Sequence, residues 1–329
     1  MKVLFIGGTG VISSACSELA IQKGIELYLL NRGQSKRPET RGAIHLQGDI
    51  HQPDNASAAI GDMTFDSVVE WLAFTPDQVQ SDIELFRNRT RQYVFISSAS
   101  VYQKPPSSLP ITESTPLYNP IWKYSRDKAA CEAILEQNGR EKGFPYTVVR
   151  PSHTYDRTLF PFHGGYTTVA RMRAGKQVVV HGDGTSLWTL THHRDFAVGL
   201  VGLLGNPHTI GQSFHITSDE SLSWNQIYTI VAHAAGVEPR LVHVPSELIA
   251  QYDPRWGDSL LGDKAHSMIF DNRKIRQLVP QFHPVIPFWQ GVQEIIAWYD
   301  EDKSRQLVDQ QYDEVQDRLI AAMQRALPE

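Results

Sequence analysis

Tyr124 and Lys128 are four residues apart in a segment of helix-forming composition, so both side chains would lie on one helix face, one turn apart. A lysine ammonium close to a phenol favours the phenolate and lowers the phenol pKa from its usual value of about 10. The pair could therefore act as a general acid and base, and the ammonium could hold a ribose hydroxyl. An isolated pair with this spacing is more often an ordinary helix surface, so the interpretation depends on the neighbouring elements.

A cluster of hydroxyl side chains follows the apolar run at 92–96, which predicts a buried strand. Ser97, Ser98 and Ser100 come directly after this run. Because ligands bind beyond the carboxyl ends of the strands in open α/β sheets, we expect these hydroxyls to face the ligand cleft.

The first residues predict a strand, a tight turn and a helix. The apolar run at 2–6 leads into Gly7 and Gly10, and the helix expected at 14–23 ends at Gly24. A helix N-terminus offers free backbone N–H groups, and glycines let a pyrophosphate approach the backbone closely. We therefore expect Gly7, Gly10, Val11 and Ile12 to bind a dinucleotide cofactor.

The second predicted strand, at 26–30, ends at Asn31 and Arg32 without the acidic residue that would bind a ribose 2′-hydroxyl. Asn31 can still bind a ribose, and Arg32 can pair with a 2′-phosphate, with Lys36 and Arg37 adding positive charge. This pattern favours NADP over NAD. The alternative is that Arg32 is only a solvated loop residue.

A third strand is expected at 43–50, and it ends at Asp49 and Ile50. Both would face the adenine end of the cofactor. Asp49 could accept a hydrogen bond from the adenine amino group or cap the next turn.

Strands and helices alternate through the first half of the chain, with further strands expected at 65–72 and 92–96. This alternation predicts an α/β fold with a Rossmann-type, doubly wound parallel sheet. The dinucleotide-binding domain would cover residues 1–160, with later segments at about 178–217 returning to it. Residues 161–329 would mainly form a smaller substrate-binding lobe, with a loop at 251–258 and terminal helices at 291–299 and 312–326.

Together these motifs resemble the extended branch of the short-chain dehydrogenase/reductase superfamily, the NAD-dependent epimerase/dehydratase family. The resemblance runs from residue 1 to about residue 298 and makes this chain a divergent member. It implies that Ser98 is the catalytic hydroxyl, Tyr124 the acid/base, and Lys128 the residue that lowers the Tyr124 pKa and holds the cofactor ribose.

Two departures from the family pattern bear on the substrate. Ala99 and Ser100 stand where many dehydratases of this branch carry an Asp-Glu pair, which disfavours a 4,6-dehydration. Leu187 and Trp188 stand near the position of an arginine that binds a substrate diphosphate, so a substrate other than a nucleotide-sugar fits better. The residues expected to contact substrate are Ser100, His153, Tyr155, Trp188 and His192.

Composition restricts the other roles. The formal charge is −5 and no basic block is present, which disfavours nucleic acid and membrane surfaces as partners. Cys16 and Cys131 fall in expected helices and are interpreted as small buried side chains. His192 and His193 are adjacent on an extended segment and would face opposite ways, so no metal is expected. A cytoplasmic protein is expected, and the superfamily resemblance leaves a homodimer open.

The resemblance thus implies an NAD(P)-dependent epimerase or dehydrogenase/reductase that acts on a sugar or sugar-like alcohol by tyrosine-assisted hydride transfer. The sequence does not separate these reactions. The opening glycines and the Asn-Arg-Gly segment also resemble the chloroplast stem-loop RNA-binding proteins. A catalytically silent NAD(P)-sensing or RNA-associated protein is therefore the alternative.

Overall fold

The structure is a computed structural model that describes residues 1–34, 37 and 40–326. Its centre is a sheet of seven strands that all run parallel. In spatial order the strands are β11 (Gln212–Ile216), β6 (Tyr146–Pro151), β5 (Tyr93–Ile96), β4 (Ser67–Glu70), β1 (Lys2–Ile6), β2 (Glu26–Asn31) and β3 (Ile44–Gln47). The order reverses beside β1, so the carboxyl ends of β1 and β4 border a crevice where this kind of sheet binds ligands.

Helices cover both faces of the sheet because its inner strands are apolar on both sides. One face packs against α1 (Ser13–Gln22), α6 (His193–Leu203) and α10 (Arg273–Leu278). The other face packs against α2 (Pro53–Ile60), α3 (Pro76–Phe86) and α4 (Lys123–Lys142). The expected doubly wound Rossmann-type fold is therefore confirmed.

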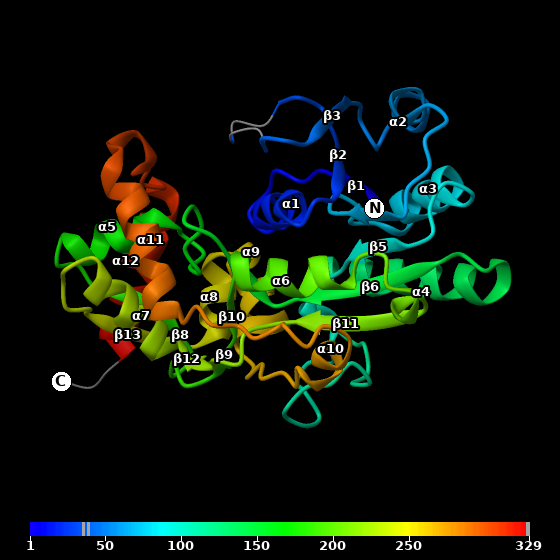
Figure 1. Ribbon diagram of the computed structural model, residues 1–329. Helices are drawn as coiled ribbons and strands as arrows, with labels where there is room; N and C mark the ends of the chain where they lie inside the picture. The colour runs from blue at the N-terminus through cyan, green and yellow to red at the C-terminus, as the bar shows by residue number, and fades with distance from the viewer. Residues whose placement is uncertain (35–36, 38–39, 327–329) are drawn as a thin grey trace.

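The second lobe contains the helices α5 (Tyr166–Arg173), α7 (Trp224–Ala234), α8 (Ser246–Tyr252), α9 (Pro254–Ser259), α11 (Phe288–Glu301) and α12 (Gln310–Ala326). Figure 1 shows α5, α7, α11 and α12 gathered at the opposite end of the molecule from α2 and α3. Three two-stranded sheets complete the lobe: β8 (Val178–His181) with β13 (Leu241–Val244), β7 (His153–Tyr155) with β10 (Leu190–His192), and β9 (Leu187–Trp188) with β12 (Leu222–Ser223).

The chain returns to the first domain later than the sequence predicts. The strand at 178–181 pairs with β13 in the second lobe, and only α6 and β11 rejoin the main sheet. The expected stretch of 178–217 is therefore too long at its start.

The segment at 251–258 is not the loop that the sequence suggests. It forms the end of α8 and most of α9, and a π-helical turn, η3 (Leu260–Lys264), follows directly. Trp256 is buried here and stacks on His163 with 5.6 Å between ring centres. The Asp253 side chain caps α9, and Pro254 stands in its first turn, where proline is compatible with a helix.

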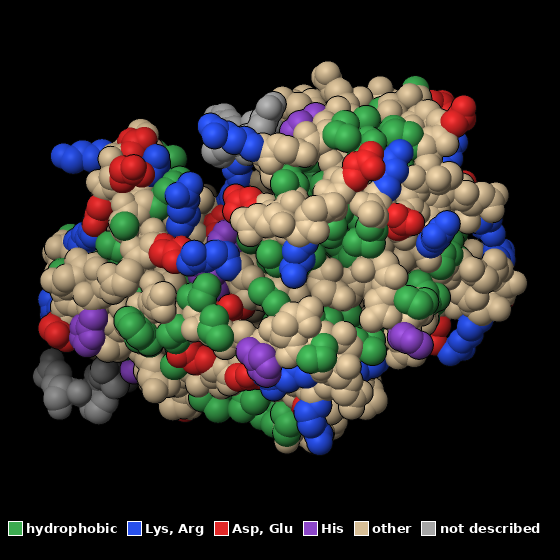
Figure 2. Space-filling view, in the orientation of Figure 1, with side chains coloured by type: hydrophobic (Ala, Val, Ile, Leu, Met, Phe, Trp, Pro, Cys, Tyr) green, Lys and Arg blue, Asp and Glu red, His purple; other side chains and the backbone are tan. Residues whose placement is uncertain are grey.

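Short elements and surface features complete the description. Three-residue 3-10 turns lie at η1 (Ala99–Val101), η2 (Pro207–Thr209) and η4 (Lys303–Arg305). Over the described part of the chain, no helix combines the length and apolar character needed to cross a membrane. On the face drawn in Figure 2, Lys and Arg side chains are dispersed among acidic ones and form no continuous basic patch.

Candidate active site

A large cleft runs along the carboxyl ends of β1, β2 and β4 and has a volume of about 1040 Å³. All nine residues expected to bind the cofactor line it: Gly7, Gly10, Val11, Ile12, Asn31, Arg32, Asp49, Ile50 and Lys128. Lys36, which was expected to add charge near Arg32, lies outside the described residues.

The glycine turn leaves room for a phosphate because two of its residues adopt conformations that favour glycine. Gly7 and Gly8 have φ angles of 107° and 88°. A Cβ atom on Gly8 would lie 2.6 Å from Leu29 Cδ2, so a larger residue would have to displace the Leu29 side chain. The Gly10 N–H donates to Ser13 Oγ at 2.8 Å, which fixes the turn at the start of α1.

The residues of the cleft fit a dinucleotide. The indole N–H of Trp71 is buried in its wall and finds no acceptor among the described residues, so a polar group of a ligand could satisfy this donor. Asn31 Oδ1 accepts from the Gly33 N–H at 2.9 Å, and Asp49 Oδ1 accepts from the His51 N–H at 3.1 Å. The Asp49 side chain thus caps the next turn, one of its two expected roles, while still lining the cleft.

The side chain of Lys128 is almost fully buried between its own helix, α4, and the sheet. Its ammonium donates to two backbone carbonyls, Ala73 O at 2.7 Å and Ile96 O at 2.8 Å. An ammonium has three donors, so one remains for a ligand in the cleft. Burial lowers the Lys128 pKa to about 8.

Tyr124, one turn before Lys128, does not have the lowered pKa that the sequence suggests. Burial raises the pKa of Tyr124, a hydrogen bond with Ser98 opposes the shift, and the charge of Asp263 adds to it. The Lys128 ammonium instead donates hydrogen bonds to the carbonyls of Ala73 and Ile96. The phenol therefore holds its proton at neutral pH and is ready to donate it.

Ser98 and Ser100 belong to a chain of hydroxyls at the carboxyl end of β5. Ser98 Oγ donates to Ser100 Oγ at 2.9 Å, and Ser125 Oγ donates to the same Ser100 oxygen at 2.7 Å. Ser125 directly follows Tyr124 in α4, so this chain ties the hydroxyl turn to the helix that carries the tyrosine.

A buried ion pair stabilises the contact between α4 and the hydroxyl-bearing turn after β5. Arg150 in β6 binds Glu132 in α4, with 2.6 Å between Arg150 Nη2 and Glu132 Oε2. Glu132 also accepts a short hydrogen bond from Ser97, the first hydroxyl after β5. Glu132 lies one turn beyond Lys128, so the network fixes α4 against the strand end that presents Ser98.

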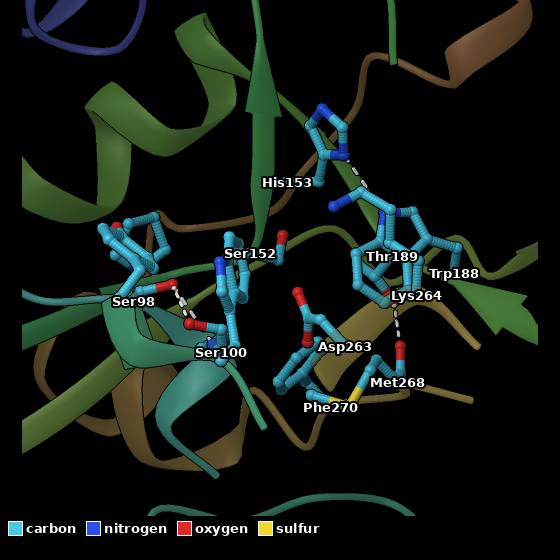
Figure 3. Close-up of a pocket in the computed structure, with 14 residues that line it drawn as sticks. Ser98, Ser100, Ser152, His153, Trp188, Thr189, Asp263, Lys264, Met268 and Phe270 are labelled. Atoms are coloured by element: carbon cyan, nitrogen blue, oxygen red, sulfur yellow. Dashed lines mark hydrogen bonds between the residues drawn. The ribbon is translucent and has the colours of Figure 1, made fainter. Parts of the chain in front are cut away.

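A second, smaller cavity of about 270 Å³ opens beside the cleft. Ser98 and Tyr124 line both spaces and therefore stand at the junction between them. Three expected substrate residues, Ser100, His153 and Trp188, also line the smaller cavity. Figure 3 shows Ser98 and Ser100 on one side of it and Trp188 on the other.

Tyr155 and His192, the other two expected substrate residues, do not line this cavity. Each is 1% exposed, and their rings contact each other edge to face with 5.3 Å between centres. Tyr155 also packs against Phe288 and Gly291 in α11. Both residues are therefore packing elements, because the side chains of β7 and β10 alternate and these two point into the core.

The residues of the smaller cavity that the sequence interpretation missed include Trp122, Asp263 and Lys264. Trp122 precedes α4 and contacts Tyr124 with 5.0 Å between ring centres, so its closeness to the tyrosine in sequence was a usable signal. Asp263 and Lys264 come from η3, and no local pattern indicates that this turn reaches the site. Among the described residues, no group of three or more His, Cys, Asp or Glu side chains is arranged to hold a metal ion.

A parallel sheet with a glycine turn at β1 and a Tyr-Lys pair opening onto the same cleft is the arrangement of the extended short-chain dehydrogenases/reductases. Comparison with known proteins agrees: residues 3–217 match the NAD dependent epimerase/dehydratase family, and the chain belongs to that family. The resemblance inferred from the sequence is thereby confirmed.

Individual relatives are distant. The chloroplast stem-loop binding protein of 41 kDa b from Arabidopsis thaliana is 25% identical over 262 residues, covering 74% of this chain and 65% of that protein. A UDP-glucose 4-epimerase from Lactobacillus helveticus is 31% identical over 170 residues, covering 46% of this chain and 51% of that enzyme. Each match thus spans less than two thirds of the relative's own length.

The fold has solved counterparts. The UDP-glucose 4-epimerase of Thermus thermophilus, determined in complex with NAD, superposes with a TM-score of 0.72 at 20% identity and covers 91% of this chain and 99% of that one. At this identity the likeness establishes the fold alone.

Proposed function

We propose that this chain is an NAD(P)-dependent oxidoreductase or epimerase that transfers hydride at a carbinol carbon of a sugar or sugar-like alcohol. Tyr124 moves the hydroxyl proton, Ser98 holds the substrate oxygen, and Lys128 binds the cofactor ribose. The family consists of NAD-dependent epimerases and dehydratases, which supports the general class of reaction.

One observation carries the proposal: Ser98 and Tyr124 line both the large cleft and the smaller cavity. A group at this junction can touch a cofactor on one side and a substrate on the other. Lys128 lines only the cleft, as a residue that binds the cofactor should.

The residues of the cleft fit NAD(P), which would supply the hydride acceptor when bound. The backbone of Gly7 to Ile12 at the start of α1 would bind its pyrophosphate, and Lys128 would give its remaining donor to the ribose. The raised pKa of Tyr124 keeps the phenol protonated, so this residue is poised to donate to a carbonyl oxygen. In the oxidative direction it would accept the proton back.

The chemistry is tested by Tyr124→Phe, which removes the proton carrier and keeps the ring. We expect turnover of a sugar-like alcohol or ketone, followed by nicotinamide absorbance, to fall by roughly 100-fold or more, because acid/base catalysis contributes about 10²–10⁴. Cofactor affinity measured by calorimetry should stay within about threefold of wild type, because the glycine turn and Lys128 are untouched.

Tyr146→Phe provides the matched control. Tyr146 begins β6 and so lies at the amino ends of the parallel strands, whereas the site lies at their carboxyl ends. Loss of the Tyr146 hydroxyl should therefore leave turnover unchanged. Full activity of Tyr124→Phe with a substrate that the wild type turns over would overturn the catalytic assignment.

The competing function is that of a binding protein without turnover. The likeness to the Arabidopsis stem-loop binding protein favours RNA as the ligand of such a protein. The formal charge of −5 and the mixed charges in Figure 2 argue against an RNA surface. Salt-dependent binding of a stem-loop RNA, together with no turnover of any sugar-like alcohol or ketone, would support the alternative.

A further inference from the structure

Lys264, in η3, lines the smaller cavity on the side opposite Ser98 and Ser100 (Figure 3). Its ammonium lies over two indole rings, 5.5 Å from the centre of Trp122 and 5.7 Å from the centre of Trp188. Both rings line the same cavity, so the charge is held between two aromatic faces beside the candidate catalytic groups.

The neighbouring acid, Asp263, forms its ion pair with a different lysine. Asp263 Oδ1 lies 3.2 Å from Lys104 Nζ, and the Lys104 side chain is 1% exposed. With Lys104 and Asp263 balanced, Lys264 leaves the group with one net positive charge. Within the described part of the chain, the Lys264 ammonium has no ion-pair or hydrogen-bond partner.

Two histidines beside Lys264 add no charge of their own. Burial lowers the pKa of His153 to about 3 and that of His181 to about 4, and in both cases the nearby Lys264 charge adds to the effect. Both imidazoles are thus neutral at physiological pH. Of the two charged side chains that line the cavity, Asp263 is therefore paired with Lys104, whereas Lys264 contacts aromatic rings.

Lys264 is partly buried, and a cation withdrawn from water without a close counter-ion is unfavourable, a penalty that the indole contacts offset only in part. Such a charge in a ligand cavity is compensated when a ligand supplies an anion. We propose that Lys264 binds a compact anionic group, a carboxylate or a phosphate monoester, carried by the substrate whose alcohol carbon faces Tyr124. This inference rests on the proposed function and narrows its substrate to anionic sugar-like alcohols.

The size of the site favours a small substrate over a nucleotide-sugar. The cavity holds about 270 Å³, and a neighbouring one of about 220 Å³ shares Trp122, His153 and Lys264 with it. Lys264 stands where the two meet, so an anion bound there occupies the junction. A single ammonium matches one compact anion, whereas a diphosphate is better matched by the fork of an arginine.

The test is calorimetric titration of the full chain, with NAD present, with four probes: glucuronate, glucose phosphate, glucose and UDP-glucose. We expect glucuronate or glucose phosphate to bind at least tenfold more tightly than glucose, and the better of the two identifies the anion. Lys264→Met keeps the unbranched stem against the indoles and removes the charge. It should weaken binding of that anionic probe by roughly 10- to 100-fold, while Lys264→Arg should retain most of it.

Lys142→Met provides the same change of charge at the exposed end of α4 and should bind like wild type. Melting temperatures show whether each variant folds, and Lys264→Arg preserves the test if Lys264→Met does not. Equal binding of glucose and the anionic probes, or binding unaffected in a folded Lys264→Met, would overturn the inference. Binding of UDP-glucose alone would overturn it as well.

The same titrations in Tyr124→Phe separate this inference from the proposed function. Lys264-dependent binding of the anion should persist there although turnover is lost. If Tyr124→Phe stays active while binding still depends on Lys264, the catalytic assignment fails and the anion site stands.

Discussion

Tyr124 is the residue on which the proposed chemistry depends, and its environment differs from the one that its spacing to Lys128 suggests. Burial raises its pKa, whereas Lys128 gives its donors to Ala73 O and Ile96 O. In the proposed reaction, Tyr124 therefore transfers the proton. Lys128 binds the carbonyl groups of Ala73 and Ile96 and would bind the cofactor ribose.

Arg32 is the residue from which we predict the cofactor preference. It lines the cleft just after β2, where no acidic side chain competes for the ribose 2′ position. We expect NADP to raise the melting temperature more than NAD at equal concentration. Arg32→Glu should reverse the preference, weakening NADP by roughly tenfold or more, because it removes a charge-assisted pair and adds repulsion.

The comparison for Arg32 is Arg91→Glu, which makes the same change beside the amino end of β5, remote from the cleft. This variant should keep the wild-type preference. Equal melting shifts with both cofactors, or a larger shift with NAD, would show that Arg32 does not select the 2′-phosphate.

Between β4 and α3, a pair of buried acids lies behind the Lys128 anchor. Glu70 accepts the N–H groups of Leu72 and Ala73, the latter at 2.8 Å, and Tyr93 donates its hydroxyl to Asp82 at 2.7 Å. The Ala73 carbonyl in turn accepts from Lys128. Burial raises the pKa of both acids, that of Asp82 to about 7.

This pair makes stability depend on pH. A carboxyl whose folded pKa is raised contributes most below its unfolded value of about 4, and the contribution is lost as pH rises towards the folded value. Asp82→Asn is always neutral and escapes this loss. From about pH 4 to about pH 7, its unfolding free energy in urea should rise relative to wild type by on the order of 1–3 kcal/mol.

Asp62→Asn, at an exposed position before β4, provides the control for Asp82 and should follow the wild-type curve at every pH. A constant difference in unfolding free energy between Asp82→Asn and wild type would mean that Asp82 is already ionised in the folded protein.

Elements with local signals could be predicted from the sequence, and elements defined by distant contacts could not. Thr75 and Ser223 form the capping boxes that begin α3 and α7, and a cap is encoded within four residues. The pairing of β8 with β13 joins segments about 60 residues apart and leaves no such mark. The segment at 251–258, which forms the end of α8 and most of α9, was mistaken for a loop because the burial of Trp256 depends on contacts that are distant in sequence.

The candidate site divides in the same way. Eight of the nine residues expected to bind the cofactor lie at or after strand ends of a regular sheet, where chain order predicts position, and all nine line one cleft. The substrate side is built from η3 and from short strands of the second lobe. Lys264 and Asp263 were missed and Tyr155 and His192 were misplaced there, because tertiary packing alone decides which of these side chains reach the cavity.

At the scale of the whole molecule, the site exists because two lobes meet over the carboxyl edge of one sheet. Arg37, from the segment between β2 and β3, binds Asp156 after β7 at 2.6 Å, and Asp195 in α6 accepts the Ile286 N–H at 2.9 Å. These contacts join the cofactor-binding sheet to the segments that carry the substrate cavity. The two spaces therefore keep a fixed relation, with Tyr124 and Ser98 between them.

A crystal structure of the chain with NAD or NADP bound tests this account most directly. It should show the pyrophosphate at the backbone of Gly7 to Ile12, the nicotinamide ribose within hydrogen-bond reach of Lys128 Nζ, and the nicotinamide ring beside Tyr124. A nicotinamide ring bound away from Tyr124, or a cofactor outside this cleft, would contradict the proposed enzyme.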